Sequence, residues 1–243
     1  MPGPDSALED WINGNSSSVK LFTHDFRNPI SAIITNLGYM KTVLEDADED
    51  TREAIEDSIQ AVNSLLAMIG NHTQIGRLEA GEHQGVGSVK LDEFVNRSVE
   101  RCRKLFSASS PPIEIDDGIA PQICEWEIPY AELALDNLIV TASRYSPTDG
   151  VVKVSARVEG NNALFVVRDQ GAPIAREHHE DIFTRSHQTR SKSDSGSRYG
   201  RALGLYAVGL AANFLRGHAA VGDTEGGQAI ELMLPLRPGS LED

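Results

Sequence analysis

The chain has 243 residues, of which 40% are hydrophobic, and a formal net charge of −14. This length allows one large or two small domains. The negative charge argues against nucleic acid or a membrane as partner, because both would require a basic face. The chain contains no run of about 18 apolar residues and no basic N-terminal segment before an apolar core, so it is expected to be soluble and cytoplasmic. Cys102 and Cys124 lack metal-like spacing and are expected to be reduced.

Two long amphipathic helices are predicted in the first third of the chain. Apolar residues recur at steps of three and four over residues 17–45 and again over residues 51–81. The acidic turn between these stretches offers Asp50 or Thr51 as a cap for the second helix. Two such helices form a hairpin with an apolar seam, so we predict a homodimer in which two hairpins make a four-helix bundle.

The pattern changes after a glycine-rich linker at residues 81–87. Residues 151–158 and 163–168 alternate with period two around a turn at 160–162, which predicts a strand hairpin. A polar loop at 186–201 leads into an apolar helix. The helices expected in this part are 91–105, 130–144 and 203–215, and the other strands are 113–115, 123–127, 219–221 and 229–234.

The predicted fold class is α+β, with a helical hairpin followed by an α/β sandwich whose helices gather on one face. The predicted divisions are a lead at 1–16, a hairpin at 17–85, a sandwich at 86–238 and a tail at 239–243.

The segment Phe22-Thr-His-Asp-Phe-Arg-Asn-Pro29 places His24 next to an acid. His24 lies about 200° around the helix from both Phe22 and Phe26, so it projects away from the apolar stripe. Taken alone, this segment fits a surface histidine among local acids as well as it fits a reactive one.

Six segments of the chain carry recognisable motifs. They are His24-Asp-Phe-Arg-Asn-Pro29, Arg77-Leu-Glu-Ala-Gly81, Asn137-Leu-Ile-Val-Thr-Ala-Ser-Arg-Tyr-Ser-Pro147, Arg168-Asp-Gln-Gly171, Asp181-Ile-Phe-Thr-Arg185 and Gly200-Arg-Ala-Leu-Gly-Leu205. In this order and spacing they resemble the phosphoacceptor box, the end of the second bundle helix, and the asparagine, first glycine, phenylalanine and second glycine boxes of bacterial sensor histidine kinases. The resemblance covers about residues 17–236 and implies a dimerisation and phosphotransfer hairpin before an ATP-binding sandwich.

For the first box, the resemblance implies that His24 is the nucleophile that becomes phosphorylated. Asp25 would accept a hydrogen bond from the other ring nitrogen, which fixes the tautomer and stabilises the cation that forms. Asn28 lies four residues on, on the same helix face, and would orient a water that removes phosphate from a partner regulator. Pro29 cannot donate to the Asp25 carbonyl and loosens the helix there.

The resemblance also implies a nucleotide site in the second part of the chain. Its residues would be Asn137, Arg144, Tyr145, Asp169, Gly171, Arg185, Gly200 and Gly204. The basic residues of the loop before Gly204 would line a lid suited to phosphate; they are Arg185, Arg190, Lys192, Arg198 and Arg201.

Three positions depart from the family's pattern. Thr141 stands where the family has an asparagine that binds Mg²⁺, and its hydroxyl is a poorer ligand than an amide oxygen. Pro173 replaces the second glycine of the first glycine box, and Ala202 replaces a glycine where the backbone approaches phosphates. These changes predict impaired use of ATP and Mg²⁺, which would be the cofactors only if the altered site still functions.

Three functions therefore remain open. In the first, favoured by these departures, His24 exchanges phosphate with an aspartate of a response regulator receiver domain, and ATP use is doubtful. In the second, the chain is an active ATP-dependent histidine autokinase whose sensor is another protein. In the third, it is a non-catalytic pseudokinase scaffold. The expected partners are a receiver domain, a second copy of the chain and an upstream kinase or sensor protein.

Overall fold

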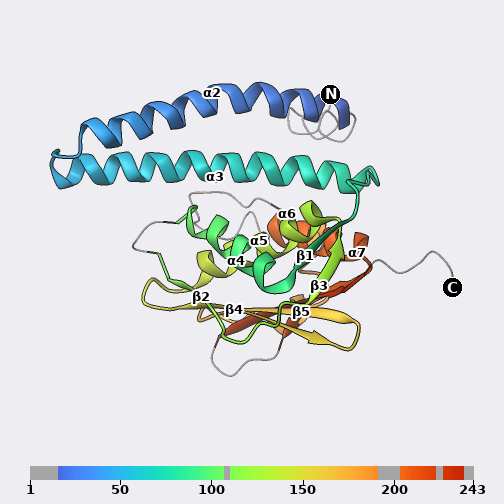
Figure 1. Ribbon diagram of the computed structural model, residues 1–243. Coiled ribbons are helices and arrows are strands. Elements are labelled where there is room, and N and C mark those ends of the chain that lie inside the picture. The colour runs from blue at the N-terminus through green and yellow to red at the C-terminus, as the bar shows by residue number, and fades with distance from the viewer. Residues whose placement is uncertain (1–15, 107–109, 191–202, 223–226, 238–243) are drawn as a thin grey trace. The chain divides into compact units, whose positions relative to one another are not determined.

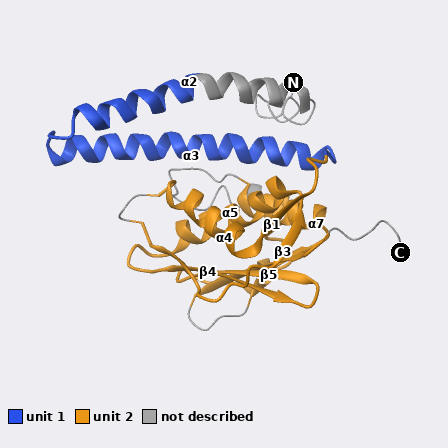
Figure 2. Ribbon diagram, in the orientation of Figure 1, with its two compact units in different colours: residues 1–82 blue, residues 83–243 orange. Residues whose placement is uncertain are grey.

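The computed structural model describes residues 16–106, 110–190, 203–222 and 227–237, and the description leaves aside the side chains of 16–28 and 188–190. The chain divides into two compact units, residues 1–82 and residues 83–243 (Figure 2). Each unit is described by itself.

The first unit is a helical hairpin. Helix α2 (Ser16–Val43) packs side by side with α3 (Glu49–Glu79), and the two run in opposite directions (Figure 1). Ile30 and Ile55 are buried. Six other large apolar side chains of the described hairpin are exposed, namely Ile33, Tyr39, Met40, Val43, Leu44 and Leu65. The described part of the hairpin thus keeps an apolar surface that its own packing does not cover.

The cap of α3 differs from the prediction. Asp48, rather than Asp50 or Thr51, is the N-cap, and its Oδ1 accepts from the Thr51 backbone N at 2.8 Å. The Thr51 hydroxyl donates to Oδ2 at 3.0 Å. The two hydrogen bonds from Thr51 lower the pKa of the Asp48 carboxyl below its ordinary value. Asp48 is the better cap because it is the residue with extended backbone just before the first helical turn.

A five-stranded mixed sheet forms the base of the second unit. Its order is β2-β4-β5-β7-β6, and only the β2–β4 pair is parallel. The strands are β2 (Ile113–Ile115), β4 (Val152–Glu159), β5 (Asn162–Asp169), β6 (His218–Gly222) and β7 (Gln228–Pro235). β4 and β5 form the predicted hairpin, with Glu159 paired to Asn162 at the turn. The predicted strands are present, with ends shifted by at most one residue.

Three helices cover one face of this sheet (Figure 1). They are α4 (Leu91–Arg103), α5 (Ile128–Tyr145) and α7 (Gly204–Phe214). The core between the layers centres on Phe94, Trp126 and Phe165, whose rings lie 5.2 to 5.9 Å apart. All three are almost completely buried. The predicted α+β class, with a helical hairpin before a sandwich of this type, is confirmed.

Three elements were missed by the sequence analysis. Strand β1 (Gly87–Lys90) pairs with β3 (Ile123–Trp126) in a separate two-stranded sheet, where only a linker was expected up to residue 87. The short 3₁₀ helix η1 (Arg176–His178) was not predicted. Helix α6 (Arg185–Arg190) lies mostly within the segment 186–201 that was predicted to be a polar loop. Both α6 and β1 are too short for their periodicity to stand out, and β1 depends on pairing with a distant strand.

Candidate functional site

The predicted phosphoacceptor lies in α2. The backbone of His24, Asp25 and Asn28 is helical, but their side chains fall outside the description, so their roles stay predictions. Pro29 lies inside the helix and is exposed. Since proline has no backbone N–H, the helix lacks the hydrogen bond to the carbonyl of Asp25, next to His24.

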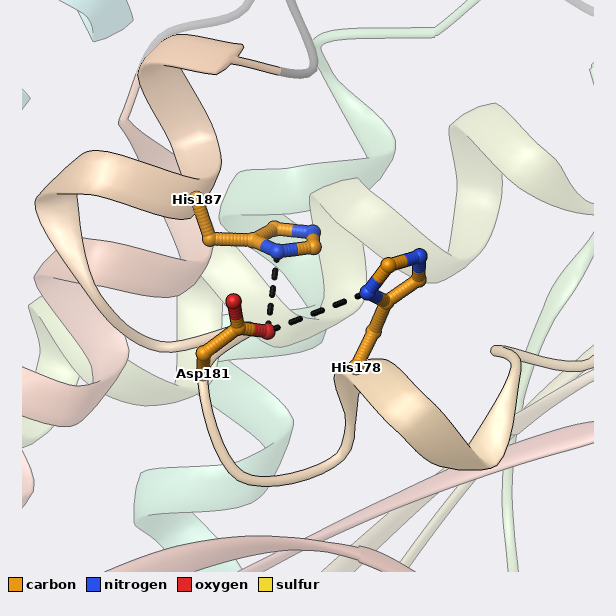
Figure 3. Close-up of side chains that lie close together, drawn as sticks. All are labelled: His178, Asp181 and His187. Atoms are coloured by element: carbon orange, nitrogen blue, oxygen red, sulfur yellow. Dashed lines mark ion pairs between the residues drawn. The ribbon is translucent and has the colours of Figure 1, made fainter.

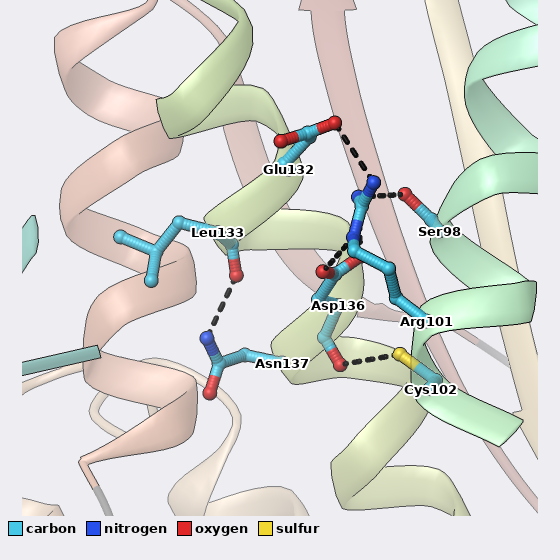
Figure 4. Close-up of polar contacts among 7 residues, drawn as sticks. All are labelled: Ser98, Arg101, Cys102, Glu132, Leu133, Asp136 and Asn137. Carbon is cyan, nitrogen blue, oxygen red and sulfur yellow. Dashed lines mark hydrogen bonds and ion pairs between the residues drawn. The ribbon is translucent and has the colours of Figure 1, made fainter. Parts of the chain in front are cut away.

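In the second unit, α5 is held in place by a polar cluster on α4 (Figure 4). Arg101 donates to Asp136 through Nε at 2.9 Å and Nη2 at 3.1 Å, and to Glu132 through Nη1 at 2.9 Å. The same Nη2 also reaches the Ser98 hydroxyl at 3.0 Å. Burial raises the pKa of Asp136, and the hydrogen bonds from Arg101 act in the opposite direction. The planar guanidinium thereby fixes the rotation of α5 about its axis.

That rotation turns Asn137 toward the other side of α5. Asn137 is buried, and its amide nitrogen donates to the carbonyl of Leu133 at 2.8 Å (Figure 4). The Thr141 hydroxyl donates to the Asn137 carbonyl at 2.6 Å. A β-carbon placed on Gly204 would lie 3.2 Å from Asn137 Oδ1 and 3.5 Å from Thr141 Oγ1. Two oxygens of α5 therefore face the first residue of α7.

Helix α7 begins at Gly204, and Leu203 at its N-cap makes no side-chain cap hydrogen bond. The first N–H groups of a helix have no partner within it and carry a partial positive charge that favours anions. Gly204, Asn137 and Thr141 thus place a helix end of the kind that favours anions beside two oxygen atoms, and oxygen is the donor that Mg²⁺ prefers. Gly200 and Ala202, also assigned to this site, lie outside the described residues.

A second group of predicted residues meets where β5 ends. Asp169 is the last residue of β5 and is 9% exposed. Its Oδ1 accepts from the backbone N of Gly171 at 2.7 Å. Burial raises the pKa of Asp169, and the hydrogen bond from Gly171 opposes that rise. A β-carbon on Gly171 would overlap the carbonyl oxygen of Tyr145, so the end of α5 lies directly against this loop.

Gln228 supports the loop after Asp169 and was not singled out by the sequence analysis. It is buried at the start of β7, where it pairs with Asp169 in the sheet. Its Oε1 accepts from Ile174 N at 2.6 Å, and its Nε2 donates to the Ala229 carbonyl at 2.7 Å. Gln228 thus ties down the backbone just after Pro173. A lone glutamine at the start of a strand gives no signal in the sequence that could have indicated this contact.

The remaining residues predicted for the nucleotide site are exposed or lie outside the described residues, although the Tyr145 backbone lies against Gly171. The side chains of Arg144 and Tyr145 are exposed at the end of α5, and Arg185 is exposed at the start of α6. The side chain of Arg190 lies outside the description, as do the residues Lys192, Arg198 and Arg201. The structure therefore brings together Asn137, Thr141 and Gly204 at one point of α5 and Tyr145, Asp169 and Gly171 at another.

Comparison with known families accounts for both units. Residues 19–81 match the His Kinase A (phospho-acceptor) domain. Residues 128–238 match the histidine kinase-, DNA gyrase B- and HSP90-like ATPase domain. The chain is a histidine kinase core. The site on α5 and α7 lies within its ATPase domain, and His24 lies within its phosphoacceptor domain.

Individual relatives agree with this family. The core is 27% identical over 187 residues to the sensor-like histidine kinase SenX3 of Mycolicibacterium smegmatis, covering 76% of this chain and 48% of the relative. It is 25% identical over 195 residues to the sensor protein KdpD of Clostridium acetobutylicum, covering 78% of this chain and 21% of the relative. The chain thus spans about half or less of the length of these curated relatives.

A solved structure supports the same architecture. Full-length ShkA in complex with AMPPNP superposes with a TM-score of 0.59 at 19% identity, covering 91% of this chain and 46% of that one. At this identity the likeness shows the fold alone. Within the described residues, no helix is both long and apolar enough to cross a bilayer.

The comparisons revise the order of the three functions. The doubt about ATP use is not supported, because residues 128–238 match the histidine kinase-, DNA gyrase B- and HSP90-like ATPase domain. They favour the alternative, an ATP-dependent histidine kinase.

Proposed function

We propose that this chain is the core of an ATP-dependent histidine autokinase. The second unit binds ATP with Mg²⁺ and transfers the terminal phosphoryl group to His24, which passes it to an aspartate of a response regulator receiver domain. The observation that carries this proposal is the approach of Asn137 and Thr141 to the start of α7 within a matched ATPase domain.

The nucleotide site divides its tasks among the two groups on α5. Asp169, by the family resemblance, accepts a hydrogen bond from the adenine amino group, and Gly171 keeps that loop close to Tyr145. The N–H groups at the start of α7 bind phosphate oxygens. The oxygens of Asn137 and Thr141 suit Mg²⁺, which would neutralise charge on the phosphates. Arg144 and Arg185 are proposed as further phosphate contacts.

The phosphoacceptor end works through a neutral imidazole. One nitrogen of His24 attacks phosphorus as the bond to the leaving ADP oxygen breaks, and the other keeps its proton, which Asp25 accepts in a hydrogen bond. Asn28 is proposed to act in dephosphorylation, in which it orients a water molecule toward the phosphorylated aspartate of the regulator. We assign residues 17–85 to the phosphotransfer hairpin and 86–238 to the ATPase domain, with the hairpins of two chains paired in a bundle.

Because of the three departures from the family's pattern, we propose that the chain phosphorylates His24 slowly. Thr141 supplies a weaker oxygen than the usual amide, Pro173 restricts φ where glycine is usual, and Ala202 adds a methyl group where the family has glycine. Each change weakens binding of ATP and Mg²⁺ without removing the site.

The test is incubation with γ-labelled ATP and Mg²⁺. Wild-type protein is expected to acquire an alkali-stable, acid-labile label, as phosphohistidine does. His24→Ala should abolish the label, and His218→Ala, which removes an exposed histidine of β6, should retain it.

A second arm separates the other two functions. The protein is incubated with receiver domains that have been phosphorylated by acetyl phosphate. A label from the receiver domain but none from ATP would support phosphotransfer without kinase activity. Absence of label in both arms, with no thermal shift at millimolar ATP, would leave a non-catalytic scaffold and overturn the proposal.

A further inference from the structure

Three potential metal-ligand side chains meet outside the nucleotide site, around Asp181 (Figure 3). Oδ1 of Asp181 lies 2.9 Å from Nδ1 of His187 and 3.9 Å from Nδ1 of His178. The two imidazole rings meet nearly edge to face, with centroids 4.8 Å apart. Figure 3 shows both rings turned toward the same carboxylate oxygen.

Hydrogen bonds of the backbone and of the Thr184 hydroxyl hold these three residues in place. The carbonyl of His178, at the end of η1, accepts from Ile182 N at 2.9 Å. The carbonyl of Asp181 accepts from the N and Oγ1 of Thr184, at 2.8 and 2.6 Å. The Thr184 hydroxyl oxygen in turn accepts from His187 N, in α6, at 3.3 Å. The cluster is therefore built into one continuous turn between η1 and α6.

The neighbouring histidine has a different task. His179 Nε2 lies 2.9 Å from the carbonyl of Ile174, which can only accept, so this nitrogen carries the proton and donates. His179 is thereby tied to its own loop, and His178 and His187 are the two imidazoles left to face Asp181.

The spacing of the ligand atoms suits a small tetrahedral ion. All three atoms lie within 4.8 Å of one another. Ligands about 2.0–2.1 Å from Zn²⁺ in a tetrahedron are about 3.4 Å apart, so modest side-chain rotations bring the set into range. Two imidazoles and a carboxylate favour Zn²⁺ over Mg²⁺, which prefers oxygen ligands.

Two further features support a metal site. His187 is largely buried, with 12% of its side chain exposed, while His178 and Asp181 are 45% and 38% exposed and leave an approach from solvent. Glu177 Oε1 lies 3.6 Å from Nε2 of His178, on the side of the ring away from Asp181. A carboxylate in that place orients a metal-bound imidazole through its second nitrogen after a small rotation.

We propose that His178, Asp181 and His187 form a Zn²⁺-binding site, with Nδ1 of each histidine and the carboxylate as ligands and water in the fourth position. The ion would join η1 to α6, in the stretch of chain that separates Asp169 from Gly204. Because ligand imidazoles must be deprotonated, Zn²⁺ binding is expected to weaken as the pH falls.

The test is calorimetric titration of metal-free protein, purified without a polyhistidine tag, with Zn²⁺ in the absence of nucleotide. One ion per chain is expected to bind, and a large excess of Mg²⁺ should not compete. His178→Ala, His187→Ala and Asp181→Asn should each weaken binding at least tenfold. His218→Ala, which removes an exposed histidine elsewhere in the same unit, should bind as wild type does.

Two measurements on the wild type guard against variants that fail to fold. Zinc-edge X-ray absorption should show two imidazole nitrogens and oxygen ligands at about 2.0–2.2 Å. Co²⁺ in place of Zn²⁺ should give the intense visible absorption of four-coordinate cobalt. The proposal would be overturned if the wild type did not bind Zn²⁺ at concentrations up to about 100 µM. Wild-type affinity for Zn²⁺ in a folded His187→Ala protein would overturn it as well.

Discussion

Gly171 lies so close to Tyr145 that a β-carbon at residue 171 would overlap the Tyr145 carbonyl oxygen. The same β-carbon would lie 2.7 Å from Asp169 Oδ1, inside ordinary contact distance. The absence of a side chain at this position therefore sets how closely the loop after β5 approaches the end of α5. The adenine end of the proposed site depends on that approach.

Gly171→Ala is expected to weaken nucleotide binding by roughly tenfold or more, since Asp169 must shift and lose its hydrogen bond from Gly171. It should also destabilise the unit by about 1–3 kcal/mol, because the backbone moves apart. Calorimetric titration with ATP and urea unfolding measure the two effects. Gly160→Ala is the control for binding, since residue 160 lies in the β4–β5 turn with no atom within 4 Å of an added β-carbon, and it should leave ATP affinity unchanged. Because its φ of 59° also disfavours alanine, the two variants are compared in ATP affinity and not in stability.

Asp169→Asn is expected to separate stability from binding. Burial raises the folded-state pKa of Asp169, so the folded protein holds this proton more tightly than the unfolded chain does. The stabilisation from the bound proton is complete at pH values below the unfolded pKa of about 3.9 and is lost as the pH rises through the folded value. The asparagine variant, which never bears that charge, should therefore melt at a higher temperature than wild type at pH 7, with the difference shrinking toward pH 4.

The same variant should bind ATP at least tenfold more weakly, because a hydrogen bond to a charged acceptor contributes about 1.5–3 kcal/mol. Asp149→Asn removes an exposed acid of the same unit and is the control. Thermal melts from about pH 4, near the pKa of an unfolded carboxylate, to about pH 8 measure the stability effect. A lower melting temperature for Asp169→Asn than for wild type at pH 7 would contradict the argument.

Thr141→Asn is expected to raise autophosphorylation of His24. The amide oxygen is a better Mg²⁺ ligand than the hydroxyl, and residue 141 faces Gly204 beside Asn137. We expect a several-fold faster initial rate, on the order of 1 kcal/mol in the barrier, and saturation at lower Mg²⁺. Thr148→Asn, at an exposed turn, should leave the rate unchanged. An unchanged rate in a folded Thr141→Asn protein would show that this position does not limit the reaction.

Arg101→Met is expected to cost about 1–3 kcal/mol of unfolding free energy, because it leaves the carboxylate of Asp136 without its main partner. The affinity for ATP should also fall in this variant. The contacts of Arg101 set the rotation of α5 about its axis, and this rotation determines the position of the Asn137 side chain. Urea unfolding and calorimetry measure both effects. Lys90→Met removes an exposed pair with Glu93 and should change neither, and equal losses in the two variants would contradict the role given to Arg101.

The prediction of helices and strands succeeded where a periodic pattern of apolar residues extends over many residues. The stripes of α2 and α3 and the alternation of β4 and β5 gave bounds within about two residues, because each pattern repeats several times along the element. It failed at β1 and α6, which are too short to establish a period. The cap of α3 was placed at Asp50 or Thr51 instead of Asp48 because three candidate residues stand close together in one acidic turn.

The amino-acid sequence by itself determined the order of the elements, the α+β class and the motifs that resemble a histidine kinase core, including His24, Asn137 and Asp169. These follow from local patterns, since periodicity says which residues share a face. Only the tertiary structure decided which faces meet: Asn137 with Gly204, Gly171 with Tyr145, Arg101 with Asp136. The folding of a turn likewise brought His178 and His187 around Asp181. Such contacts depend on how whole elements pack and twist, and no local repeat in the chain encodes them.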